Sequence, residues 1–234
     1  MSALGLERQR RVWSKRAVSW DHGSVTGLDR VIETVIDHAR PAPTDVAVDL
    51  GCGTGQVTFP LAKLVDRVIA VDISPAMIEL LRSNAQERGL GNVDARVAPI
   101  EKLHLDPGSV DLVVSNYSLH HLADRDKSVL VEHAVTWLRP GGRLVIGDMM
   151  FGRGGDARDW NIAASKMSAL ARRGPGGWWR IAKNLWRYLW RVQERPIAMS
   201  RWESILQSHG LVEVTGVPVV AEAAVVAGTK PATA

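Results

Sequence analysis

Residues 46–56 read Val-Ala-Val-Asp-Leu-Gly-Cys-Gly-Thr-Gly-Gln, so an apolar run passes directly into three alternating glycines. The apolar run predicts a buried strand, and the glycines predict a tight turn into a helix. Glycines at such a turn let the backbone approach a ligand closely, and the ligand binds at the carboxyl end of the strand. We therefore expect a ligand site directly after residue 50. The alternative is an ordinary strand–helix turn.

Acidic residues near this turn restrict the chemistry of the ligand. A dinucleotide-binding fingerprint needs its third glycine at position 56, which is Gln56 here. Asp49 stands two residues before the first glycine, where a carboxylate would repel a pyrophosphate but would suit a cation. Asp72 ends the next apolar run, where a carboxylate can accept hydrogen bonds from both hydroxyls of a ribose. The alternative is that Asp72 only interacts favourably with the dipole of the helix that follows it. A positively charged, phosphate-free adenosine cofactor such as S-adenosylmethionine (SAM) meets both conditions.

Short apolar runs alternate with helical patterns from residue 44 onward. The expected strands lie near 45–50, 67–72, 93–98, 110–115, 143–149, 211–217 and 219–228. Ser74 and Pro75 predict a helix start, as N-cap and first helical residue, and Ser200 with Glu203 predicts a capping box. Such alternation predicts an α/β fold with a parallel sheet covered by helices on both faces.

Composition excludes several classes of protein. The chain has 234 residues, of which 46% are hydrophobic and 23% charged, as in ordinary globular proteins. Its single cysteine argues against a disulfide framework or a Cys-rich metal site, and no His, Asp and Glu cluster has the spacing of metal ligands, so we expect no metal. No apolar run approaches the roughly 18 residues of a membrane span, and no signal peptide is recognised, so we expect a soluble, cytoplasmic protein.

Four motifs occur together in the order and spacing of a known family. They are VDLGCGTG at 48–55, VIAVDIS at 68–74, DLVVSNYSLHHL at 111–122 and LRPGGRLVIGD at 138–148. With these motifs the sequence resembles the class I SAM-dependent methyltransferases, and it is most similar to the small-molecule type, which includes the quinone-biosynthesis methyltransferases. The resemblance implies a Rossmann-like, seven-stranded, mostly parallel sheet.

The resemblance also implies the organisation of a single methyltransferase domain, residues 1–234. Residues 1–40 would form helices of an N-terminal lid, and residues 44–150 would form the SAM-binding core. Residues 151–198 would form a helical insertion after the fifth strand that covers the substrate. Residues 199–234 would contribute a C-terminal helix and a strand pair.

Several cofactor contacts follow from the family pattern. Asp49 would hold the methionyl amino group of SAM, and Asp72 would hold the ribose. The backbone turn beneath the cofactor would comprise Gly51, Cys52, Gly53 and Gly55. Asn116, at the end of the fourth strand, would face the methyl-transfer centre mainly through its backbone.

The adenine contacts include one departure from the family pattern. Ile73 and Met77 would line the adenine pocket. Family members often have an acidic residue after the third strand that contacts the adenine amino group, but Pro99 stands near that place here. Ile100 or Glu101 would take over this contact.

Two histidines and a tryptophan are the candidates for catalysis and closure. His120 and then His121 are candidate general bases, because they follow the fourth strand and histidine titrates in the useful range. A base is needed only where the acceptor holds a proton at neutral pH, and the alternative is local capping or packing. Trp20, in the pattern of the family's lid, would close over the cofactor and exclude water; the alternative is a tryptophan packed against the domain.

Residues 178–195 predict a strongly amphipathic helix, with Arg and Lys on one face and Trp and Leu on the other. Three interpretations compete: a cover over the substrate pocket, docking to an anionic membrane surface, or nucleic-acid binding. Residues 116–119 lack the N/D-P-P-Y/F motif of enzymes that methylate nucleic-acid bases, which argues against nucleic acid.

Together these features favour SAM-dependent transfer of a methyl group to a small, lipophilic or aromatic acceptor. The first alternative is a membrane-associated lipid or quinone methyltransferase that docks through residues 178–195. A nucleic-acid methyltransferase and a SAM-binding regulator without turnover are the others. The sequence does not indicate the oligomeric state.

Overall fold

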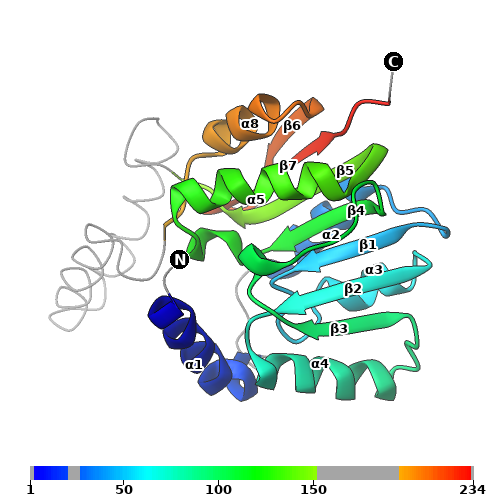
Figure 1. Ribbon diagram of the computed structural model, residues 1–234, viewed down its shortest axis with the longest axis vertical. Helices are drawn as coiled ribbons and strands as arrows, with labels where there is room; N and C mark the ends of the chain where they lie inside the picture. The colour runs from blue at the N-terminus through cyan, green and yellow to red at the C-terminus, as the bar shows by residue number, and fades with distance from the viewer. Residues whose placement is uncertain (1–2, 21–26, 152–194, 233–234) are drawn as a thin grey trace, which may run out of the picture.

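The computed structural model describes residues 3–20, 27–151 and 195–232. A seven-stranded sheet lies at the centre, in the order β3-β2-β1-β4-β5-β7-β6 (Figure 1). Its strands are β1 (Val46–Leu50), β2 (Arg67–Asp72), β3 (Val93–Val97), β4 (Val110–Asn116), β5 (Leu138–Met149), β6 (Val212–Pro218) and β7 (Ala223–Thr229). Neighbours from β3 to β5 pair in parallel, and β7 is antiparallel to β5 and β6. The α/β class and the mostly parallel sheet are therefore confirmed.

Helices cover both faces of this sheet. They are α1 (Ala3–Trp20), α2 (Leu28–Ala39), α3 (Thr58–Ala62), α4 (Pro75–Glu87), α5 (Asp124–Trp137) and α8 (Met199–Ser208), with short 3₁₀ helices η1 (Ile100–Lys102) and η2 (Leu119–His121). In Figure 1, α1 lies beside the carboxyl ends of the parallel strands, where it also packs against α4.

Alternate residues of the strands explain this layering. In β1, Ala47 packs in the cluster that contains side chains of α2 and α3, whereas Val48 packs in the cluster that contains side chains of α5 and α8. Both residues are fully buried. A strand buried on both faces must be apolar along its whole length, which is why the central strands read as uninterrupted apolar runs.

The helix starts test two local predictions. Ser74 caps α4 as expected, because its Oγ accepts the backbone N–H of Met77 at 3.3 Å. The capping box at Ser200 is wrong: α8 begins at Met199, and its N-cap is Ala198 without a side-chain cap. Trp202 is fully buried in the first turn of α8, and such packing outweighs a local cap in deciding where a helix begins.

The fifth strand is longer than expected. It begins at Leu138 rather than near residue 143, and the pairing moves from Val110 with Leu138 to Leu112 with Arg143. Residues 139–142, which were expected to precede the strand, therefore lie inside β5, where the register of its pairing with β4 shifts.

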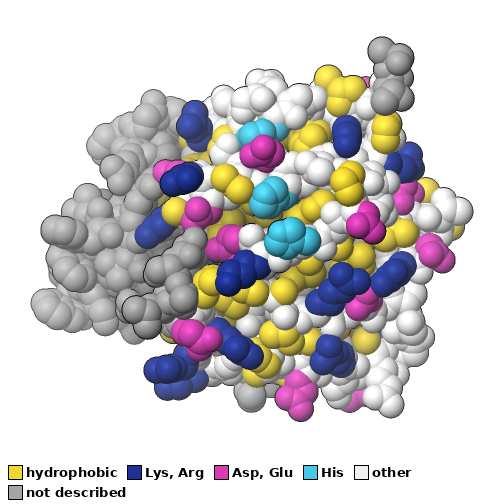
Figure 2. Space-filling model, viewed as in Figure 1, with side chains coloured by type: hydrophobic (Ala, Val, Ile, Leu, Met, Phe, Trp, Pro, Cys, Tyr) yellow, Lys and Arg dark blue, Asp and Glu magenta, His cyan; other side chains and the backbone are white. Residues whose placement is uncertain are grey.

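The predicted amphipathic helix at 178–195 lies outside the described residues, except for Arg195, which is not helical. Within the described ranges, no helix is both long enough and apolar enough to cross a membrane. Figure 2 shows positive and negative side chains interspersed over the face that carries α4, α5 and α8. Among the described residues, Asp94 forms ion pairs with Arg67 and with Arg96.

Gly147→Ala is expected to destabilise the fold where α2 crosses β5. A Cβ at Gly147 would lie 2.6 Å from a methyl of Val35 and 2.9 Å from Asn116 Oδ1. Overpacking of this kind costs about 1–3 kcal/mol, which urea unfolding would measure. Gly91→Ala is the control, because its Cβ would meet nothing within 4 Å. Equal free energies of unfolding for both variants would contradict this account of the α2–β5 contact.

Candidate functional site

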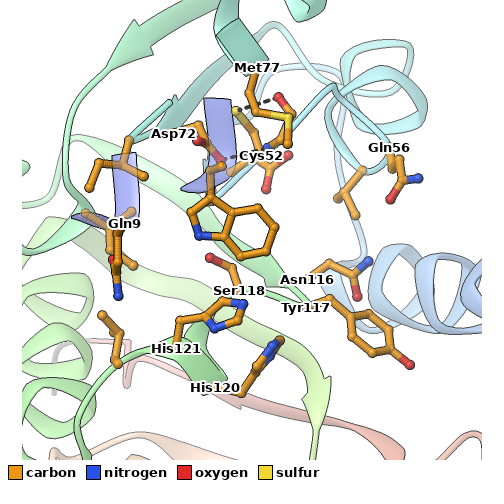
Figure 3. A pocket seen from close by; sticks show the side chains of 18 of the residues that line it. Gln9, Cys52, Gln56, Asp72, Met77, Asn116, Tyr117, Ser118, His120 and His121 are labelled. Carbon is orange, nitrogen blue, oxygen red and sulfur yellow. Dashed lines mark hydrogen bonds between the residues drawn. The ribbon is translucent and has the colours of Figure 1, made fainter. Parts of the chain in front are cut away.

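A cavity of about 270 Å³ lies at the carboxyl ends of the parallel strands and is closed on one side by α1 (Figure 3). It opens between the neighbouring strands β1 and β4. From this pair the strand order runs outward in opposite directions, through β2 and β3 on one side and through β5 on the other. Open parallel sheets bind ligands at such a switch point. The lining combines the glycine turn after β1 with the ends of β2, β4 and β5.

The glycine turn has a backbone that only glycine adopts easily. Gly51, Gly53 and Gly55 have φ angles of 74°, 53° and 104°. A side chain at Gly51 would also collide with the hydroxyl of Ser118. The turn is tied to β2, since the N–H groups of Gly51 and Cys52 both donate to the Val71 carbonyl, at 2.8 and 3.0 Å. The loop thus exposes backbone to the cavity at a fixed place.

Two carboxylates, the buried Asp49 and the partly buried Asp72, lie at one end of the cavity. Asp49 is 1% exposed and accepts the Thr58 hydroxyl at 2.6 Å. Asp72 accepts the backbone N–H groups of Gly53 at 3.1 Å and of Ser74 at 2.8 Å. Burial raises the pKa of both, to about 7 for Asp49, where the charge of Asp72 adds to the effect. Loss of water thus disfavours their charged forms, and neutral donors only partly offset it.

A short wall beside Asp72 is apolar apart from one carboxylate. It is formed by Ile73, Met77, Pro99 and Ile100. Glu101 also lines the cavity, and its Oε1 is buried without a hydrogen-bond partner. A flat apolar ligand with one donor group would match this wall.

His120 lies at the opposite end of the cavity (Figure 3). It is fixed by Asp148, near the end of β5. Asp148 accepts both the backbone N–H of His120, at 2.8 Å, and its Nδ1, at 2.5 Å. The His120 ring also contacts that of His121, at 4.0 Å between centroids, and His121 in turn contacts Trp13 of α1 at 4.9 Å. Both histidines therefore have fixed orientations between the sheet and α1.

The 3₁₀ helix that carries these histidines is also held from its other side. Lys127 of α5 is fully buried, and its Nζ donates to the carbonyls of Leu122 at 3.0 Å and Arg195 at 2.6 Å. Arg195 donates its own N–H to the His120 carbonyl at 2.6 Å. The chain that returns to the core at residue 195 is therefore bonded directly to the backbone of His120.

This geometry can be compared with known proteins. Residues 47–142 match a family described as a methyltransferase domain. The aklanonic acid methyltransferase DauC of Streptomyces sp. (strain C5) is 35% identical over 123 residues, which cover 51% of this chain and 55% of DauC. A ubiquinone biosynthesis O-methyltransferase of Methylocella silvestris is 34% identical over 146 residues, or 62% of this chain and 54% of that protein. Residues 47–142 thus form a methyltransferase domain.

Solved structures agree with this assignment at the level of the fold. The DhpI–SAH complex aligns with 100% of this chain and of its own chain, with a TM-score of 0.70 and 18% sequence identity. The chain spans about half the length of the curated relatives that it matches, between 37% and 55% for four of them.

The structure brings most of the residues predicted from the methyltransferase motifs to one cavity. Those that line it are Asp49, Gly51, Cys52, Gly53, Asp72, Ile73, Met77, Pro99, Ile100, Asn116, His120 and His121. Gly55 is not among them, because it lies behind the turn against the ring of Phe59. Trp20 is the last residue of α1, and its side chain lies outside what the structure describes.

Other lining residues were not predicted from the sequence. Trp13 lines the cavity, although the lid pattern pointed to Trp20, and Gln9 lies on the same side of α1. Tyr117 lines the part of the cavity away from Asp72, and Glu222, whose charge acts on Tyr117, also lines the cavity. Tyr117 stands inside a quoted motif, but nothing in the sequence marks Glu222, which the antiparallel strand pair brings in.

Among the described residues, no group of His, Cys, Asp and Glu could hold a metal ion.

Asp49→Asn is expected to flatten the dependence of stability on pH. The Asp49 carboxyl has a pKa of about 7 in the folded protein against an ordinary value of 3.8, so the folded state binds the proton more tightly. That contribution to stability is fully present below pH 3.8 and is lost as the pH rises through 7. Urea unfolding should show the parent losing stability relative to the Asn variant over this range.

The control for this measurement is Asp94→Asn. Asp94 lies in an exposed ion pair that lowers its pKa, so its contribution is lost only as the pH falls below the ordinary range. Between about pH 5 and 8 its variant should run parallel to the parent. A parallel curve for Asp49→Asn as well would show that Asp49 ionises normally.

Proposed function

We propose that the protein is an enzyme that transfers the methyl group of SAM to a small, aromatic or lipophilic molecule. The observation that carries the proposal is the cavity itself, which has the carboxylates of Asp49 and Asp72 at one end and His120, paired with Asp148 behind it, at the other. A cofactor held by the acids would direct its methyl group toward the histidine end. A regulator without turnover has no need for that second, enclosed end.

The cofactor assignment is supported by the charge of the first end. SAM carries a cationic sulfonium and an ammonium group, and either would relieve the unfavourable burial of Asp49. Asp72 is held through both oxygens by backbone N–H groups, and each oxygen keeps a lone pair for a ribose hydroxyl. Glu101 Oε1 is the unpartnered acceptor that would take the adenine amino group, in place of the acid replaced by Pro99.

The acceptor assignment is supported by the lining of the other end. Trp13, Tyr117 and Met149 supply apolar area around the histidines. The relatives named for aklanonic acid and for ubiquinone biosynthesis indicate the class of small organic acceptor.

We also propose that residues 1–234 form one methyltransferase domain and that the protein is cytoplasmic. The proposal that it docks to an anionic membrane surface rests on the amphipathic sequence of residues 178–195.

The chemistry proposed for this chain needs little beyond alignment and one base. Methyl transfer is an in-line displacement, and correct placement of the two reactants supplies much of the rate. Where the acceptor is a hydroxyl, its proton must leave. Asp148 accepts from Nδ1 of His120, which leaves Nε2 as the basic nitrogen, and the carboxylate would stabilise the imidazolium that forms.

Asp72→Ala is expected to weaken binding of S-adenosylhomocysteine (SAH), the product of SAM, at least 10-fold. The change removes charge-assisted hydrogen bonds to the ribose, each of which contributes roughly 1.5–3 kcal/mol. Titration calorimetry at pH 8 would measure the affinity. Asp94→Ala is the matched control, since it removes a half-buried carboxylate that does not line the cavity. Unchanged affinity in Asp72→Ala would remove the ribose assignment, and failure of the parent to bind SAH or SAM would end the proposed function.

Asp148→Asn is expected to slow methyl transfer to a hydroxylated aromatic acceptor by roughly 10²-fold, without changing SAH affinity. An amide donates to Nδ1 instead of accepting from it, so it favours the wrong tautomer of His120. A screen of phenols with SAH release as the readout would supply the acceptor. Activity of the variant should recover at high pH, where the acceptor loses its proton unaided. A uniform loss at every pH would show that Asp148 has only a structural role.

A further inference from the structure

Tyr117 has a backbone conformation that its side chain does not favour. It directly follows β4, and its φ angle is +48°, in the left-handed region that bulky residues rarely adopt. Its N–H donates to the Gly147 carbonyl at 2.8 Å, which holds the strained residue in line with β5. Strain of this kind persists where surrounding structure imposes it, and it concentrates at binding and catalytic sites.

The phenol of Tyr117 is also buried without a hydrogen-bond partner. The neighbouring Asn116 has a buried Oδ1 in the same condition. Both residues line the cavity, and Figure 3 shows them together on one side of it, apart from Asp72 and Met77. Buried polar groups are nearly always paired in folded proteins, so two adjacent unpaired groups in a cavity indicate atoms that a ligand satisfies.

The charges nearby determine which hydrogen bond Tyr117 can make. Burial, with the carboxylates of Glu222 and Asp148, raises the pKa of Tyr117 to about 12. The phenol therefore keeps its proton at physiological pH and can donate it, whereas Asn116 Oδ1 can only accept. The same two carboxylates repel a negatively charged group placed beside the Tyr117 hydroxyl.

We infer that Tyr117 and Asn116 form the subsite that recognises the methyl acceptor, and that this acceptor presents an uncharged oxygen to Tyr117 and an O–H or N–H group to Asn116. The inference rests on the proposed function and narrows the class of acceptor. Neutral aromatic molecules that carry an oxygen should be preferred to aromatic carboxylates. In this subsite the Tyr117 hydroxyl donates to a carbonyl or ether oxygen. The acceptor hydroxyl that faces Asn116 is held at the end of β4, beside the histidines.

The first test asks whether the Tyr117 hydroxyl serves the fold. Tyr117→Phe removes an unpartnered group, so the melting temperature of the ligand-free protein should stay the same or rise. Ser115→Ala is the matched control from the same strand, because its buried hydroxyl donates to the Leu50 carbonyl at 2.8 Å. That variant should melt a few degrees lower, about 2–4 °C. An equal fall in Tyr117→Phe would overturn the subsite and assign the hydroxyl to stability.

The second test uses three probes of one shape on the SAH-saturated protein: 4-hydroxyacetophenone, 4-ethylphenol and 4-hydroxybenzoate. Titration by NMR should give the ketone about 3- to 10-fold tighter binding than 4-ethylphenol, with the carboxylate weakest. Tyr117→Phe should remove the preference for the ketone while SAH affinity stays unchanged. Equal binding of all three probes, including no measurable binding, would overturn the inference, as would a preference retained in Tyr117→Phe. Failure of the parent to bind SAH would instead count against the proposed function.

Discussion

Burying Asp49 and Asp72 in one cleft is electrostatically unfavourable, because each carboxylate loses water and the charge of Asp72 also acts on Asp49. The fold tolerates this because neutral donors hold both groups: the Thr58 hydroxyl on Asp49, and two backbone N–H groups on Asp72. One of these donors, the Gly53 N–H, reaches Asp72 because β1 and β2 are neighbours and the glycine turn brings its backbone against β2. A cationic ligand supplies the charge that the cleft lacks, which is the physical basis of the proposed cofactor.

The opposite end of the cavity depends on a different kind of support. There, a short 3₁₀ helix is held between Asp148 of β5 and the buried Lys127 of α5. A buried ammonium is costly unless it is fully bonded, and Lys127 is bonded to two carbonyls and to Asp124. Because one of these carbonyls belongs to Arg195, the return of the chain after residues 152–194 is coupled to the position of His120.

Several energetically unfavourable features of the described residues lie at the cavity. Asp49 carries the cost of burial, Tyr117 that of a strained backbone, and Asn116 and Glu101 that of unpartnered oxygens. The two clusters that fill the sheet faces are apolar and tightly buried. Such a difference between the cavity and the core is expected where stability is traded for function. Polar groups that are placed to bind a ligand lack hydrogen-bond partners until that ligand is present.

The sequence by itself determined the features that depend on local pattern: the apolar strands, the glycine turn, the cap at Ser74, and the placing of Asp49, Asp72 and His120 at strand ends. Parallel strands bring their carboxyl ends to one edge, so these residues could be assigned to one site in advance. Only the tertiary structure decided that α8 begins before Ser200, that Trp13 faces the cavity, and that Tyr117 is strained. It alone paired Lys127 with Arg195, which are 68 residues apart in the chain. Such contacts are decided by packing between distant segments, which no local periodicity or spacing records.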